Sequence, residues 1–222
     1  MERKKLIHAQ DVSLQFFNAI EENNLIAPGK TERQLNFEVC DLALKEFGIE
    51  QHWHKKIVRT GINTLAIYPD NPPDRTIDTD DILFIDLGPI VKGYEADIGR
   101  TYVLGRNPRK LKLKHDVEQA WYEIREWYER HTTLAASALF HYAVDKAKEY
   151  GWEFGGEIAG HIVGEFPHEQ PLDRRSVELD IHPDNHNDMF LPDAFGNKRH
   201  WILELQFVDK KGGIGAYFEQ LL

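Results

Sequence analysis

Apolar positions recur at helical spacing in several stretches of the chain, and these stretches come in pairs. In the first pair, an apolar stripe predicts a helix over residues 9–24. A second helix is predicted over about 32–47, because Thr31 and Gln34 have the spacing of a capping box and Gly48 is typical of a helix end. The chain thus begins with two consecutive amphipathic helices.

The remaining apolar segments predict strands. Residues 56–69 read as a strand-like segment, and 81–105 read as two strands around a tight turn. Two more amphipathic helices are then predicted over 110–130 and 137–150, and a second pair of strands lies in residues 200–222. The order of two helices followed by a hairpin therefore occurs twice.

This repeated order predicts an α/β fold with two related halves. We expect a mainly antiparallel sheet with the helices packed on one side, because hairpins pair antiparallel and amphipathic helices must bury one face. No low-complexity segment or linker separates the halves, so residues 1–222 are predicted to form a single domain. Residues 172–200 are polar and irregular, and such a long loop is compatible with either a lid or a plain surface loop.

Two aspartates interrupt the first predicted hairpin. If Lys92 and Gly93 are its two turn residues, Asp86 and Asp97 lie on the same face. They would be diagonal neighbours, with backbones roughly 7–8 Å apart. Such carboxylates can point into one cavity and hold a cation between them.

Two glutamates occupy corresponding places in the second predicted hairpin. If its loop centres on Lys211 and Gly212, Glu204 lies directly opposite Glu219. A single acid in a strand usually faces water or pairs with a basic residue. Four acids in matching places, with no set of lysines or arginines in the same strands, are better explained by bound divalent metal, because uncompensated buried charge is costly.

Histidines that could complete such a site lie in a glycine-rich loop, residues 155–171, which contains His161 and His168. A lone histidine in a loop more often has a structural role, but the four acids make His161 a better candidate for a metal ligand. Carboxylates with one imidazole suit manganese, cobalt, iron or zinc. Two ions about 3.5–4 Å apart can share bridging carboxylates and activate a bridging water for hydrolysis.

Composition and charge limit which kinds of binding partner and which cellular location are expected. The chain of 222 residues has a net charge of −10, which disfavours nucleic acid as a partner. No apolar run reaches the roughly 18 residues that span a membrane, and no secretory signal is recognisable. The single cysteine, Cys40, lies in the second helix and is expected to be a buried structural thiol, so a cytoplasmic location is expected. A homodimer is compatible with the sequence.

Taken together, these motifs resemble those of a known family. The chain has two aspartates eleven residues apart, "GHIVG" followed by "PHEQP", one glutamate in a strand and another near the end. This combination resembles the pita-bread metallopeptidases, which comprise methionine aminopeptidases, aminopeptidase P, prolidase and the non-peptidase creatinase. The resemblance covers nearly the whole chain, including the doubled order of helices and hairpin.

The resemblance implies a dinuclear centre in which each residue has a role. Asp86 would be a terminal ligand of one metal, Asp97 and Glu219 would bridge both, and His161 and Glu204 would complete the second. His168 would contact the substrate and stabilise the tetrahedral intermediate. Glu204 would also be the candidate general base toward the bridging water. The implied activity is removal of N-terminal residues from peptides, as an aminopeptidase or dipeptidase.

One departure from the family pattern leaves alternatives open. Methionine aminopeptidases carry a substrate-contacting histidine where this chain has Tyr68, and a phenol cannot act as an imidazole near neutral pH. The substrate could therefore be a small amide or amidino compound, as for creatinase. A third reading is a non-catalytic module that binds peptides or histones, although relatives of that kind lose metal ligands and this chain keeps all five.

Overall fold

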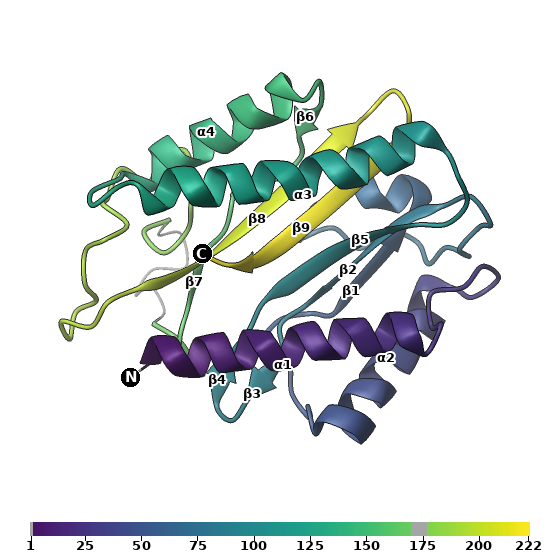
Figure 1. The fold of residues 1–222 in the computed structure, drawn as a ribbon, viewed down its shortest axis with the longest axis horizontal. Coiled ribbons are helices and arrows are strands. Elements are labelled where there is room, and N and C mark those ends of the chain that lie inside the picture. The colour runs from purple at the N-terminus through teal and green to yellow at the C-terminus, as the bar shows by residue number, and fades with distance from the viewer. Residues whose placement is uncertain (1, 170–176) are drawn as a thin grey trace.

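The computed structural model describes residues 2–169 and 177–222. Two helices and a group of strands are followed by two more helices and a second group of strands, as the hydrophobic pattern predicts (Figure 1). The first half contains α1 (Glu2–Glu22), α2 (Glu32–Phe47), β1 (Ile57–Thr60), the 3-10 helix η1 (Gly61–Leu65), β2 (Ile82–Leu87), β3 (Ile90–Val91), β4 (Tyr94–Glu95) and β5 (Ile98–Val103). The second half contains α3 (Pro108–Glu129), α4 (Ala136–Glu149), β6 (Glu153–Phe154), β7 (Ile162–Val163), β8 (His200–Asp209) and β9 (Ile214–Leu221).

The sheet is antiparallel and runs through both halves. Its strand order is β1-β2-β5-β9-β8-β6, and β7 pairs with β8 beside this path. The halves join where β5 meets β9, at the pair Gly99 and Glu219. The short strands β3 and β4 form a separate ribbon at the tip of the first hairpin. The predicted α/β class with two helix–helix–hairpin halves is confirmed.

Capping residues in the sequence predicted the ends of α2 correctly, whereas the start of α1 differs from its prediction. Helix α2 has the predicted bounds, with a capping box between Thr31 and Gln34 and a left-handed residue, Gly48, after its last turn. Helix α1 begins earlier than predicted, because Leu6 and Ala9 extend its buried stripe. The strand-like segment 56–69 is only partly a strand: it turns into η1 after Thr60.

The two faces of the sheet have different partners. In β8, Leu203, Leu205 and Phe207 belong to the core beneath α3 and α4, whereas Glu204 and Gln206 line a cavity on the opposite face. This follows from the alternation of side chains along a strand. Figure 1 shows α3 crossing β8 and β9, with α1 running alongside the first half. The helices therefore bury one face of the sheet and leave the other for the cavity.

The single cysteine differs from its expected environment. Cys40 is half-buried, and its Sγ lies 3.4 Å from Asn36 Oδ1. Burial nevertheless raises the pKa of this thiol, which keeps it protonated and unreactive near neutral pH. No helix among the described residues is long and apolar enough to cross a bilayer.

Candidate metal centre and active site

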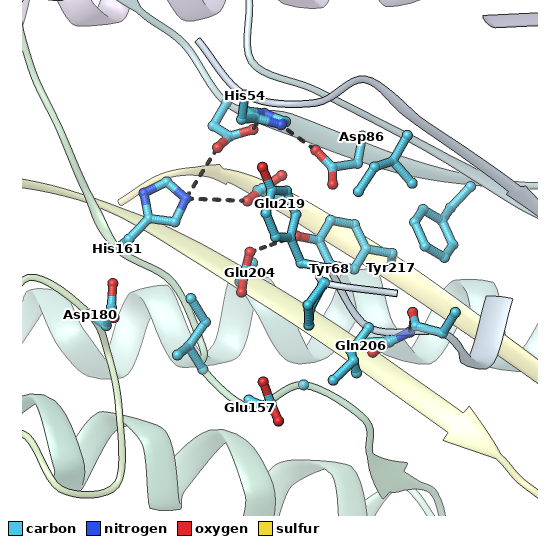
Figure 2. Close-up of a pocket in the computed structure, with 18 of the residues that line it drawn as sticks. His54, Tyr68, Asp86, Glu157, His161, Asp180, Glu204, Gln206, Tyr217 and Glu219 are labelled. Carbon is cyan, nitrogen blue, oxygen red and sulfur yellow. Dashed lines mark hydrogen bonds and ion pairs between the residues drawn. The ribbon is translucent and has the colours of Figure 1, made fainter. Parts of the chain in front are cut away.

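A cavity of about 360 Å³ lies on the face of the sheet that the helices leave open. The four acids singled out by the sequence line it: Asp86 from β2, Asp97 just before β5, Glu204 from β8 and Glu219 from β9. Figure 2 shows side chains from both halves pointing toward a common space. The cavity thus collects carboxylates that are up to 133 residues apart in the chain, from Asp86 to Glu219.

The register of the strands produces this convergence. In the first hairpin Val91 pairs with Tyr94, as predicted for a Lys92–Gly93 turn. In the second hairpin Glu204 pairs with Glu219, as predicted. The pairing of β5 with β9 then places Glu219 beside the first hairpin. Both predicted registers are confirmed, while the contact between the hairpins is visible only in the tertiary structure.

The acids are buried and electrostatically unequal. Burial raises the pKa of Asp86 to about 7 and lifts the pKa of Glu204 and Glu219 above their ordinary value, with neighbouring carboxylates adding to the effect. Burial acts in the same direction on Asp97, but the charges and hydrogen bonds of His54 and His161 outweigh it and lower the pKa of Asp97. Among the described acids of the cavity, Asp97 is the one whose pKa the nearby imidazoles lower despite burial; His54 and Arg59 also act on Asp86, but burial outweighs them there.

The donor set fits a divalent cation. Oε2 of Glu219 is buried and has no hydrogen-bond partner among the described residues. Among the described residues, two groups of three could each hold a metal ion, because each residue offers one ligand atom and these atoms lie within 4.8 Å of one another. The first group is His54, Asp86 and Asp97, and the second is Asp97, His161 and Glu219. Unsatisfied buried carboxylates of this kind are stabilised by metal.

The glycine-rich loop delivers His161 as predicted. Its Nε2 lies 3.2 Å from Asp97 Oδ2 and 4.0 Å from Glu219 Oε1, and its Nδ1 lies 2.9 Å from the Ile162 carbonyl oxygen. Gly160 has a φ of +132°, and a Cβ there would lie 2.0 Å from the Ile202 carbonyl oxygen. Glycine is therefore required for the loop to approach β8 closely enough to present His161.

A second imidazole at the carboxylates was missed by the sequence analysis, which counted one. His54 precedes β1, and its Nε2 lies 3.0 Å from Asp97 Oδ1 and 3.6 Å from Asp86 Oδ1. Burial disfavours a charged imidazole, but Asp97 and Asp86 outweigh it and raise the pKa of His54 to about 10. Residues 49–56 show no strand or helix pattern, so the only signal was the pair of histidines in "HWH" itself.

The strands also contain a cation that the sequence analysis did not count. Arg59 of β1 lines the cavity and is 4% exposed. Its guanidinium donates to the backbone carbonyls of Ala66, Ile67 and Asp70. Arg59 lowers the proton affinity of Asp86 only in part, since the pKa of Asp86 remains raised by burial. One arginine engaged with the backbone does not neutralise four acids.

His168 lies on the cavity wall, away from the carboxylate cluster. Its Nδ1 lies 2.7 Å from Oε2 of Glu95. The Glu95 carboxylate also accepts hydrogen bonds from the backbone N–H groups of Gly164, at Oε2, and of His168, at Oε1. Because a carboxylate only accepts, Nδ1 carries a proton, and Nε2 is the ring nitrogen that Glu95 does not hold. Glu95, which is 2% exposed, is a positioning residue that the sequence analysis did not identify.

Tyr68 lies at the rim of the cavity and is half exposed. Its ring meets the ring of His54 edge-on at 6.1 Å, and Lys55 Nζ lies 4.7 Å from its centre. Burial raises the pKa of the Tyr68 phenol, which keeps it a hydrogen-bond donor near neutral pH. Deeper in the cavity, the Tyr217 hydroxyl donates to Glu204 Oε2 at 2.6 Å and orients that carboxylate.

Part of the long segment 172–200 forms a wall of the cavity. Residues 172–176 lie outside the described part of the chain. Beyond them Asp180 lines the cavity, and the Ile181 N–H donates to the Gly160 carbonyl at 2.7 Å. Leu179 and Met189 are buried in the core of the second half. Residues 177–189 are therefore packed structure that supports the His161 loop.

The fold and the cavity together define the class of this protein. Two helix–helix–hairpin halves share one antiparallel sheet, and the sheet gathers acids and imidazoles on its open face. This is the pita-bread fold of metal-binding enzymes. Over residues 4–192 the sequence matches the profile of metallopeptidase family M24. The chain belongs to this metallopeptidase family.

One protein is similar to this chain in sequence, and solved structures are similar to it in fold. A protein of Mycoplasma genitalium with the provisional name Xaa-Pro aminopeptidase is 31% identical over 96 residues, which are 43% of this chain and 26% of that protein. The prolidase from Pyrococcus horikoshii superposes with a TM-score of 0.75 at 24% identity, covering 99% of this chain and 58% of that one. Methionine aminopeptidase from Thermotoga maritima superposes with a TM-score of 0.71 at 16% identity, covering 99% and 91%.

These matches differ in extent. This chain spans about a quarter of the Mycoplasma relative and less than two thirds of the prolidase. The family profile ends before β8 and β9, which carry Glu204 and Glu219. The placement of those two glutamates in the cavity therefore rests on the structure.

Proposed function

We propose that this protein is a dinuclear metal-dependent peptidase that removes N-terminal residues from peptides, with Xaa-Pro peptides as the first candidate substrates. The carrying observation is that two potential ligand groups share Asp97, whose two oxygens face different imidazoles. Family membership and the likeness to enzymes named for Xaa-Pro and methionine peptides support the proposal.

In this proposal Asp86, Asp97, His161, Glu204 and Glu219 hold two divalent ions, which are manganese, cobalt, iron or zinc. When bound, such ions polarise a peptide carbonyl and lower the pKa of water to near neutrality. The remaining steps depend on residues that hold or move protons.

Glu204 is the candidate general base. The hydroxyl of Tyr217 donates to Oε2 of Glu204 at 2.6 Å and so orients this carboxylate at the cavity, where it could accept a proton. His168 is the candidate substrate contact, because Glu95 fixes its Nδ1–H and leaves Nε2 available at the cavity wall. Tyr68 at the rim is the second candidate substrate contact.

A metal-replete assay tests this function. Protein reconstituted with manganese, cobalt, iron or zinc should release the N-terminal residue from Xaa-Pro, Met-Xaa or other short peptides, and a chelator should abolish the release. No turnover of any peptide with any of the four metals would contradict the proposal. Protein that purifies without metal and resists reconstitution would favour a non-catalytic peptide-binding role.

Tyr68 supports one alternative substrate. A phenol in place of the family's imidazole changes the hydrogen bonding at the rim, and the cavity of about 360 Å³ has room for a small amide or amidino compound. Metal-dependent hydrolysis of such compounds, with peptides inert, would assign the protein to that creatinase-like chemistry instead.

A further inference from the structure

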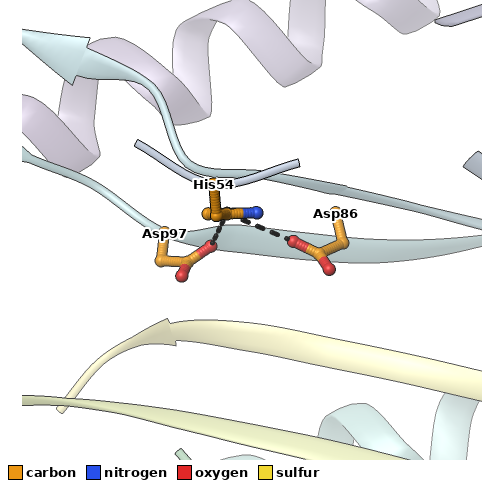
Figure 3. A group of neighbouring side chains, drawn as sticks. All are labelled: His54, Asp86 and Asp97. Atoms are coloured by element: carbon orange, nitrogen blue, oxygen red, sulfur yellow. Dashed lines mark hydrogen bonds and ion pairs between the residues drawn. The ribbon is translucent and has the colours of Figure 1, made fainter. Parts of the chain in front are cut away.

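His54 occupies the space between two acids that the proposed centre uses. It comes from the irregular segment before β1, outside the five residues that the family resemblance supplies. Its Nε2 lies 3.0 Å from Asp97 Oδ1 and 3.6 Å from Asp86 Oδ1. Figure 3 shows the ring between the two carboxylates. The side chain is 6% exposed, so water cannot readily satisfy these three atoms.

The hydrogen bond on the other side of the ring sets the tautomer. His54 Nδ1 lies 2.8 Å from the Lys55 carbonyl oxygen. A carbonyl only accepts, so Nδ1 carries one ring proton. In the metal-free protein the charged ring holds a second proton on Nε2, which faces Asp97; once that proton leaves, Nε2 presents a lone pair to the carboxylates. A lone pair and two carboxylate oxygens converge on one point, and a shared cation would satisfy all three.

His161 shows the same arrangement in the second half of the centre. Its Nδ1 lies 2.9 Å from the Ile162 carbonyl oxygen, and its Nε2 faces Asp97 Oδ2 at 3.2 Å. A backbone carbonyl that fixes Nδ1–H and frees Nε2 is the usual surrounding of a metal-bound histidine. Each oxygen of Asp97 therefore meets one imidazole that is oriented as a ligand.

Contacts of Gly88 and Trp53 hold the segment of His54 against the first hairpin. A Cβ on Gly88 would lie 2.1 Å from His54 Cδ2 and 2.5 Å from Trp53 Nε1, so any side chain at position 88 would displace this segment. Trp53 donates from its backbone N–H to the Gly88 carbonyl at 2.9 Å and from Nε1 to the Ala96 carbonyl at 3.0 Å. These bonds fasten the segment across the hairpin that carries Asp86 and Asp97.

We propose that His54 is a metal ligand of the ion held by Asp86 and Asp97, so that each ion of the centre has one imidazole. This inference rests on the proposed dinuclear function. A nitrogen ligand on the Asp86 side favours transition metals such as cobalt, iron or zinc over oxygen-preferring ions such as magnesium.

Cobalt binding tests the assignment. Titration of metal-free protein with Co²⁺, followed by calorimetry and by the visible absorption of the ion, should show two equivalents bound. His54→Gln should weaken one equivalent at least tenfold and change its spectrum, and Gly88→Ala should do the same by displacing the ring. His168→Gln is the matched control, because His168 is an imidazole of the same cavity outside the carboxylate cluster. Wild-type affinity and spectrum for both equivalents in His54→Gln would overturn the inference.

A second measurement uses the unsubstituted protein. In protein labelled with ¹⁵N-histidine and titrated with Zn²⁺, the Nε2 resonances of two imidazoles, His54 and His161, should move to the metal-bound range. Movement of His161 alone would overturn the role of His54 and leave the proposed function standing. Binding of no cobalt and no zinc by the wild-type protein would overturn the proposed function, and the assignment of His54 with it.

Discussion

Asp97 differs from the other three acids in having a positive partner for each oxygen. Both imidazoles lie within 3.2 Å of it, and together they lower its pKa although burial acts in the opposite direction. Asp86, Glu204 and Glu219 all have pKa values raised by burial. At the residue scale Asp97 is therefore the member of the set whose surroundings favour the charged carboxylate, which is the form that binds a cation.

Asp97→Asn should remove both metal binding and hydrolysis. A neutral amide cannot bridge two cations as a carboxylate does, so we expect metal content well below that of the wild type and a loss of activity of at least about 100-fold. Elemental analysis and peptide hydrolysis measure these effects, and circular dichroism checks the fold. Asp41→Asn, on α2 in an ion pair with Lys45, is the matched control. Near-normal turnover of Asp97→Asn would remove Asp97 from the site.

His200 should make the protein sensitive to mild acid. Burial, with the charges of Arg3 and Lys198, lowers the pKa of His200 from 6.5 to about 4. Since the unfolded chain takes up the proton first, stability contributed by neutral His200 is present above pH 6.5 and is lost as the pH falls toward 4. In metal-free protein, His200→Gln should reduce the loss of unfolding free energy between pH 7 and 5 by about 1–2 kcal/mol.

Urea unfolding at the two pH values measures this difference. His141→Gln is the matched control, because His141 is exposed on α4. An equal loss of stability between pH 7 and 5 in the wild type and in His200→Gln would contradict the prediction.

At the element scale, helix ends and strand registers follow from short-range chemistry. The Thr31–Gln34 capping box and Gly48 bound α2 at the predicted residues. Alternation along β8 separates Leu203 and Leu205 from Glu204, which faces the cavity. These features depend on residues a few positions apart, which is why the pattern of the sequence was sufficient to predict them.

The end of α2 provides a test at this scale. Gly48 has a φ of +64°, and a Cβ there would meet nothing within 4 Å, so Gly48→Ala should cost only the backbone penalty of a left-handed alanine. That penalty is about 1 kcal/mol, or roughly 2–4 °C in Tm for a domain of this size. Thermal unfolding measures it. Glu46→Ala, exposed in the last turn, is the control and should change little. A Tm of Gly48→Ala equal to that of the wild type would contradict the prediction.

At the scale of the whole molecule, the centre joins the two halves. Asp86 and Asp97 come from the first half, whereas His161, Glu204 and Glu219 come from the second, and Gly99 and Glu219 form the strand pair between them. Buried carboxylates repel one another unless a cation lies between them. Metal should therefore stabilise the whole fold.

Removal of metal should lower the Tm. Because metal binds the native state, an ion at 100 times its Kd adds about 2.7 kcal/mol of stability. Differential scanning calorimetry with added Mn²⁺ or Co²⁺, and with a chelator, measures the shift. Glu219→Gln should shrink the shift and leave the metal-free protein at least as stable as the wild type, because one buried acid is gone. A Tm independent of both metal and chelator would contradict this prediction.

The sequence by itself determined the order of the elements and the registers of both hairpins. It also predicted the four acids, His161 and His168 as residues of the site. Capping, alternation and turn position encode these features locally, and the family resemblance added their expected roles. Those roles remain predictions, as does the single domain over 1–222.

Only the tertiary structure decided which segments meet at the centre. It placed His54 between Asp86 and Asp97, set Glu95 behind His168, and engaged Arg59 with backbone carbonyls. His54 and Asp97 are 43 residues apart, and His54 lies in a segment with no periodic pattern. Contacts of this kind depend on how the hairpin packs against an irregular segment, and no local preference along the chain specifies that packing.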